Sequence, residues 1–150
     1  MAKVLCVDQS TRVTGHGFFQ DGQYIESGII DMSKSKLETS ARSFEMAKEI
    51  WKVIKHYKPD YLILEDVQLQ KNNAKTMIVL ARLAGMVIGY AEAHKVKVHI
   101  LTPSQWRAKL EYMQGPKVKR EELKQQSLDY VKEHLGLELP EDQADRKSVV

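Results

Sequence analysis

The chain has 150 residues, of which 43% are hydrophobic, and this length and composition suit one domain with a packed core. No uninterrupted apolar stretch reaches the roughly 20 residues that a membrane span needs, and the N-terminus leaves no room for a signal peptide, so we expect a cytoplasmic protein without a membrane partner. The single cysteine, Cys6, lies in an apolar run, which predicts a buried structural thiol in a reducing compartment.

The net charge of +3 is mild, but the charges are unevenly distributed along the chain. A basic segment spans residues 107–124, and acids dominate from residue 137 onward. Two interpretations stay open: a segment that grips phosphates beside an acidic metal site, or a solvated helix face, which composition alone favours. The basic residues of interest are Arg107, Lys109, Lys117, Lys119, Arg120 and Lys124.

Hydrophobic patterning predicts three strands near the N-terminus. The apolar run 3–8 predicts a buried strand, and residues 9–16 predict a turn. Two further strands, 17–20 and 23–31, flank the hairpin signal Asp21-Gly22. Together the three strands are typical of an antiparallel meander.

A helix should follow, because Ser35 and Glu38 have the spacing of a capping box with Ser35 as the N-cap. Pro59 disfavours helix at the residue before it, so this helix should end near Tyr57. One apolar stripe of the helix should face the core. Its members are Leu37, Ala41, Phe44, Ala47, Trp51 and Ile54.

Residues 60–65 and 96–101 predict two more strands, separated by a helix at about 72–94. That helix is apolar around most of its circumference, so it must be buried on two sides. Its second side is covered either by another copy of the protein or by the chain itself. Shorter helices are predicted at 102–110 and 118–134.

The order of these elements predicts a single α/β domain over residues 1–150, with a mixed five-stranded sheet flanked by helices. Early hairpins of this kind argue against a doubly wound nucleotide-binding sheet.

Four acidic residues indicate the chemistry: Asp8, Glu65, Asp142 and Asp145. Asp8 and Glu65 end apolar strands, where a carboxylate is costly unless a cation meets it. Asp142 and Asp145 are three residues apart and share a face if they lie on a helix. Converging carboxylates suit two Mg²⁺ or Mn²⁺ ions, and such sites hydrolyse phosphodiesters. Taken singly, Asp8 could belong to a turn and Asp142 could oppose a helix dipole.

Four motifs resemble, in order, those of the RuvC-type Holliday junction resolvases. They lie at residues 7–17 (VDQSTRVTGHG), 64–67 (LEDV) with 71–74 (KNNA), 81–85 (ARLAG) and 142–145 (DQAD). One short motif would be weak, whereas four in order across nearly the whole chain are fairly specific.

The resemblance implies an RNase H-like fold, a homodimer and metal-dependent cleavage of four-way DNA junctions in recombination and repair. The apolar surface of the 72–94 helix predicts that this helix carries the dimer contact. It makes Asp8, Glu65, Asp142 and Asp145 the ligands of two Mg²⁺ or Mn²⁺ ions per active site. Basic residues between 107 and 124 would hold the DNA backbone. Lys119 falls where the family carries a basic residue facing DNA, and Arg107 and Lys109 lie near a second such position.

Two positions depart from the family pattern. Bacterial members usually carry an aromatic residue three positions after the Glu that corresponds to Glu65, thought to wedge into the junction, whereas this chain has Gln68. Viral relatives vary more at such positions, which favours a phage-encoded member. The family's last Asp normally continues into an apolar helix, whereas residues 146–150 predict a shortened or altered C-terminal helix.

Other functions stay open. The first is a branched-DNA-binding protein without nuclease activity, which a displaced Asp145 would favour. A second alternative is an actin-like or sugar-kinase-like ATPase, but such proteins need two large lobes, which 150 residues cannot supply. A third is an RNA–DNA hybrid nuclease of the same fold, in which the Glu usually lies on a helix, whereas Glu65 is predicted to end a strand. The sequence leaves the preferred branched substrate and any branch-migration partner open.

Overall fold

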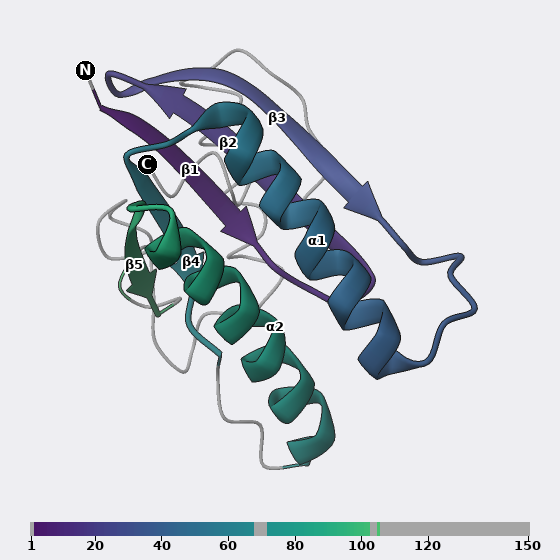
Figure 1. Ribbon diagram of the computed structural model, residues 1–150. Coiled ribbons are helices and arrows are strands. Elements are labelled where there is room, and N and C mark those ends of the chain that lie inside the picture. Colours follow the sequence, from purple (N-terminus) through teal and green to yellow (C-terminus); the bar gives the residue numbers. More distant parts are fainter. Residues whose placement is uncertain (1, 68–71, 103–104, 106–150) are drawn as a thin grey trace, which may run out of the picture.

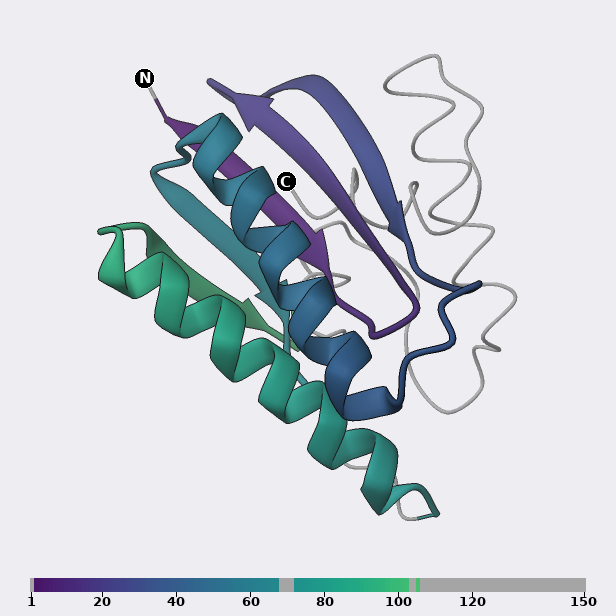
Figure 2. The same ribbon diagram turned by 45° about the vertical axis from the view of Figure 1, so that its right-hand side comes forward.

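The computed structural model describes residues 2–67, 72–102 and 105 of the chain. In these residues a five-stranded sheet carries two long helices packed side by side on one face (Figures 1 and 2). The predicted helix at 118–134 and the C-terminal segment 146–150 lie outside the described part of the chain, as does the predicted helix at 102–110 except for residues 102 and 105.

The sheet is mixed, as predicted. Its strands are β1 (Lys3–Asp8), β2 (Val13–Gln20), β3 (Gln23–Asp31), β4 (Tyr61–Glu65) and β5 (Lys97–Leu101), in the spatial order β3-β2-β1-β4-β5. The antiparallel meander β1-β2-β3 is confirmed, and β4 and β5 add parallel strands on the other side of β1.

The two turns of the meander differ in how well the sequence predicted them. Asp21 and Gly22 both have positive φ, 54° and 76°, which matches the tight turn expected of this dipeptide. The turn after β1 is shorter than predicted, because β2 already begins at Val13 and only residues 9–12 connect the two strands.

The first helix, α1, spans Thr39–Tyr57, and the capping-box prediction is wrong. The N-cap is Glu38 without a side-chain capping bond, and the Ser35 hydroxyl instead accepts a hydrogen bond from the Leu37 N–H at 3.2 Å. Short polar side chains often stabilise such local turns in place of a helix start. The predicted end at Tyr57 is confirmed, with Lys58 in the left-handed conformation before Pro59.

The predicted apolar stripe of α1 is also partly wrong. Phe44 is 56% exposed, whereas Met46 and Ile50 are fully buried. The stripe was counted from Leu37, which precedes the helix, so the true inner face is rotated from the predicted one. That inner face also includes a charged residue, Arg42, which is only 7% exposed.

The second helix, α2, spans Ala74–Ala93 and buries Leu83, Val87 and Ala91 against the core. By length and composition alone it could cross a membrane: it has 20 residues, and its apolar window has a mean hydropathy of 1.4. Core helices of globular proteins can have the same length and hydropathy. In α2, however, only 17% of that window is buried. One side of α2 is therefore covered by this fold, and much of the remainder is apolar and open.

Candidate metal and nucleic-acid site

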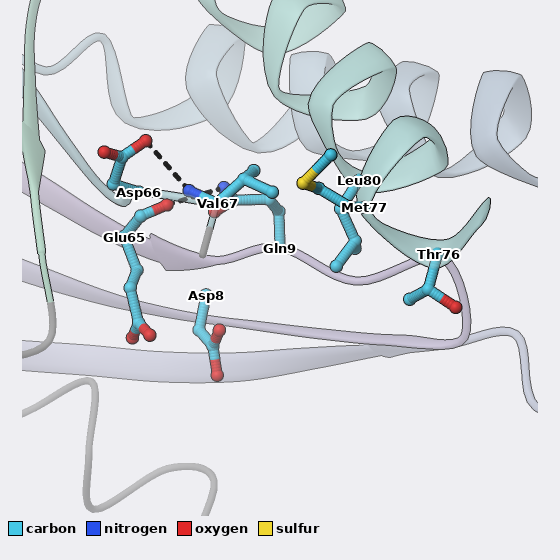
Figure 3. Close-up of a pocket in the computed structure, with 8 residues that line it drawn as sticks. All are labelled: Asp8, Gln9, Glu65, Asp66, Val67, Thr76, Met77 and Leu80. Atoms are coloured by element: carbon cyan, nitrogen blue, oxygen red, sulfur yellow. Dashed lines mark hydrogen bonds between the residues drawn. The ribbon is translucent and has the colours of Figure 1, made fainter. Parts of the chain in front are cut away.

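Asp8 and Glu65 come together at one edge of the sheet. β1 and β4 are parallel neighbours whose register pairs Val7 with Leu64, so the next residue of each strand ends it at the same edge. Val7 and Leu64 are buried under the helices, and strand alternation directs the two carboxylates to the opposite face. Figure 3 shows both side chains leaving the sheet on the same side, away from α2.

A pocket of about 160 Å³ opens beside these strand ends. Asp8 and Glu65 border it at the strand ends, although their carboxylates point away from α2, and the start of α2 borders it through Thr76, Met77 and Leu80 (Figure 3). Asp66 points the other way from Glu65, and its Oδ1 accepts a hydrogen bond from the Val67 N–H at 2.9 Å. Among the described residues that border the pocket, Asp8 and Glu65 are therefore the acids whose side chains leave the sheet on the face away from the helices.

Gln9 ties the two strand ends together, a role that the sequence analysis missed. Its Nε2 donates a hydrogen bond to the Glu65 carbonyl oxygen at 3.1 Å. The side chain is 9% exposed, and its buried Oε1 has no hydrogen-bond partner among the described residues. The signal in the sequence is a long amide directly after a strand-end acid, which suits a link between neighbouring strand ends.

The loop at residues 9–12 is held firmly at the same edge. Thr14 is fully buried, and its hydroxyl accepts from the Ser10 N–H at 3.0 Å and donates to the Ser10 carbonyl at 2.8 Å. Arg42 reaches the loop from α1 and donates from Nε to the Thr11 carbonyl at 3.1 Å. The loop therefore has a fixed shape between the sheet and α1.

Asp8 and Glu65 are oxygen donors of the kind that Mg²⁺ and Mn²⁺ prefer, so the described part of the site fits such an ion. Among the residues that the structure describes, no three His, Cys, Asp or Glu side chains gather into a group that could hold a metal. Asp142 and Asp145 lie outside the described residues, as do Gln68 and the predicted DNA-binding residues Arg107, Lys109, Lys117, Lys119 and Arg120. The structure thus brings together two of the four predicted ligands.

Cys6 takes no part in this chemistry. It is buried in β1, and burial raises the pKa of its thiol far above the ordinary value, so the thiol stays neutral. The prediction of a buried structural cysteine is confirmed.

Comparison with known proteins gives two kinds of match. A family model described as Lactococcus phage M3 protein matches residues 1–146. The crossover junction endodeoxyribonuclease RuvC of Fusobacterium nucleatum is 28% identical over 98% of this chain and 77% of its own length. The RuvC of Syntrophomonas wolfei is 30% identical over 69% of this chain and 61% of its own, so less than two thirds of that relative is spanned.

The fold has a close counterpart among solved structures. Thermus thermophilus RuvC in complex with a Holliday junction substrate superimposes with a TM-score of 0.76 at 17% identity, over 99% of this chain and 90% of that one. This likeness confirms the RNase H-like fold. The match over residues 1–146 shows that the chain belongs to the family described as Lactococcus phage M3 protein, and its sequence is similar to those of the RuvC crossover junction endodeoxyribonucleases.

Proposed function

We propose that this protein is a metal-dependent, structure-selective DNA endonuclease that cleaves Holliday junctions and other branched DNA during recombination. One observation carries the proposal: Asp8 and Glu65 lie side by side at the ends of two parallel strands, with an open pocket beside them. The names of the sequence relatives, crossover junction endodeoxyribonucleases, support the same reaction.

In this proposal Asp8 and Glu65 hold the metal together with Asp142 and Asp145. Two bound Mg²⁺ or Mn²⁺ ions would supply an activated water and stabilise the departing 3′ oxygen. The carboxylates position the ions and do not attack the phosphate themselves. Gln9 keeps the two strand ends in fixed relation, and basic residues of segment 107–124 hold the DNA backbone largely independently of sequence.

The proposal includes a homodimer through α2. A groove of about 560 Å³ runs between α1 and α2 and includes Phe44, Val79 and Gly85. Phe44 is 56% exposed and Ile78 is 46% exposed, which is unusual for large apolar side chains on two neighbouring helices. A second copy related by a two-fold axis would cover this surface and would present two active sites to two opposed strands of a junction.

A phage-encoded enzyme that acts in the host cytoplasm would suit this function, and the description of the matched family supports it. In this proposal residues 1–150 form one nuclease domain.

The deciding experiment is cleavage of a synthetic four-way junction beside a linear duplex of the same sequence, with Mg²⁺, with Mn²⁺ and with chelator. We expect metal-dependent cuts in the junction and little cleavage of the duplex. A folded protein that binds the junction but never cuts it with either metal would favour the alternative, a branched-DNA-binding protein without nuclease activity.

A further inference from the structure

A second groove, of about 680 Å³, adjoins the carboxylate pocket. It lies between the loop at residues 9–12, the first turn of α1 and the first half of α2. Its lining includes four cationic side chains, and none of the described residues that line it is acidic. The cations are Arg12, Arg42, Lys75 and Arg82.

Arg42 is the most informative of these cations, because it is 7% exposed. Its Nε donates to the Thr11 carbonyl at 3.1 Å and its Nη1 to the Leu37 carbonyl at 3.5 Å, but neither acceptor carries a charge. No carboxylate of the described residues forms an ion pair with it, since the ion pairs there are Lys48–Glu45 and Lys52–Glu49. A buried charge without a counter-charge is costly, so an anion in the groove would stabilise this arrangement.

The first turn of α2 adds to the positive potential of the groove. Thr39 of α1 and Lys75 and Thr76 of α2 line it. Neither helix has an acidic residue in its first turn, and neither has a side-chain capping bond. The N–H groups of the first turn and the positive dipole end of α2 therefore favour an anion at this place, whereas at α1 the N-cap residue is an acid, Glu38.

Thr76 and Leu80 line both this groove and the pocket at the ends of β1 and β4, so the two adjoin at the same edge of the sheet. We propose that the groove binds a backbone phosphodiester of the DNA strand, next to the phosphodiester that is cut. Arg12, Arg42 and Lys75 supply the charge, and the hydroxyl of Thr39 can donate a further hydrogen bond. This inference rests on the proposed function for its DNA substrate, and it is separate from the role assigned to segment 107–124.

The first test measures binding of a four-way junction in chelator, so that cleavage does not interfere. Arg12→Ala and Lys75→Ala remove exposed cations, and Lys55→Ala, in the last turn of α1, is the matched control. Each groove variant should bind about eightfold more weakly at 0.1 M salt and should lower the salt slope by about 0.9, as expected for one lost phosphate contact. The control should bind as the wild type does.

A second test locates the phosphate. Single phosphates near the cleavage point are replaced by neutral methylphosphonates, and the affinities of the wild type and of Arg12→Ala are compared for each junction. At one position the methylphosphonate should weaken binding by the wild type about as much as the Arg12→Ala substitution does. The same methylphosphonate should weaken binding by the Arg12→Ala variant little further. Losses that add up independently at every position would overturn the proposal.

Arg42 is tested by Arg42→Lys, which keeps the charge but loses the planar donor group. Thermal unfolding is measured beside junction binding, because Arg42 also holds the loop. Weaker binding from a variant that unfolds at the wild-type temperature supports the phosphate contact, and unchanged binding and salt slope in all three groove variants overturn it.

The outcomes separate this inference from the proposed function. A wild-type protein that cuts junctions, with groove variants of unchanged affinity, overturns the groove alone. A wild-type protein that binds junctions without cutting them, with weakened groove variants, overturns the endonuclease and supports the groove. A protein without affinity for DNA overturns both.

Discussion

Glu65 and Gln9 both act at the end of β4. Glu65 places a carboxylate there, whereas Gln9 donates a hydrogen bond to the backbone carbonyl of Glu65. Glu65 is the last residue of β4, where a charged side chain neither favours the strand nor completes a turn. Gln9 fixes the carbonyl of that same residue from the end of β1. The two side chains therefore lend themselves to separate tests.

Glu65→Gln keeps the size of the side chain and removes its charge. We expect the variant to bind four-way junctions like the wild type. Its cleavage rate should fall by more than roughly 10–100-fold, which is the usual effect of losing a residue that only supports a metal ligand. Binding and cleavage are measured side by side, with Glu92→Gln on the exposed end of α2 as the control. Unchanged cleavage would remove Glu65 from the site.

Gln9→Met fills the same space without the amide. The lost hydrogen bond should lower the free energy of unfolding by about 1 kcal/mol. Because the strand ends are then less firmly held, the affinity for Mn²⁺ should fall by roughly 10–100-fold. Titration calorimetry with Mn²⁺ and thermal unfolding check the two effects. A stability change with unaltered Mn²⁺ affinity would reduce Gln9 to a packing role.

At the scale of elements, the pairing of β2 with β3 depends on one close approach. Gly28 of β3 pairs with His16 of β2, and a Cβ on Gly28 would lie 2.7 Å from His16 Nε2. The His16 ring is held against Tyr57 of α1, with ring centres 5.9 Å apart, so it has little room to move. The glycine thus lets a side chain of the sheet pack beneath the end of α1.

Gly28→Ala should therefore lower the free energy of unfolding by about 1–3 kcal/mol, the usual cost of overpacking. His16→Ala should remove the clash. In the Gly28→Ala variant, His16→Ala should therefore lower the free energy of unfolding by less than it does in the wild type. Gly89→Ala, where a Cβ meets nothing within 4 Å, is the control and should be stabilising by about 0.5–1 kcal/mol in a helix. Equal melting temperatures of Gly28→Ala and wild type would contradict the argument.

Most element positions followed from the sequence, because long apolar runs and turn dipeptides are local signals. All five strands and both described helices were predicted, although β2 begins at Val13, within the residues predicted to form a turn. One error in α1 is local, and the other comes from tertiary packing. Ser35 formed a local turn in place of a cap, and the inner face of α1 took up Arg42 and excluded Phe44, since the loop carbonyls and the sheet decide which side of the helix is buried.

At the scale of the whole molecule, the exposed apolar surface of α2 should govern association. Ile78→Glu places a charge on the open side of that helix, where Ile78 is 46% exposed. A dimeric protein should become monomeric with little loss of folding, and light scattering with thermal unfolding measures both. Lys75→Glu, one turn earlier, changes charge without removing apolar surface and is the control for association. A wild type that is already monomeric would contradict the dimer.

The site was predictable only in part for a related reason. That Asp8 and Glu65 end strands is visible in the sequence, but their adjacency depends on β1 and β4 being parallel neighbours, which is a property of the sheet. The groove cations come from a loop and two helices that are far apart in the chain. Nothing local relates Arg12, Arg42 and Lys75, so only the fold reveals them.

The burial of Cys6 has a practical consequence for measuring any of these effects. The chain contains a single cysteine, and its raised thiol pKa and lack of exposure keep it from reacting with maleimides. A cysteine introduced at Gln23, exposed beside the Asp21-Gly22 turn at the end of the sheet opposite Asp8, should thus take up a fluorophore alone. We expect one label per folded chain, no label on the wild type until it is denatured, and a reporter that leaves the edge with Asp8 and Glu65 untouched.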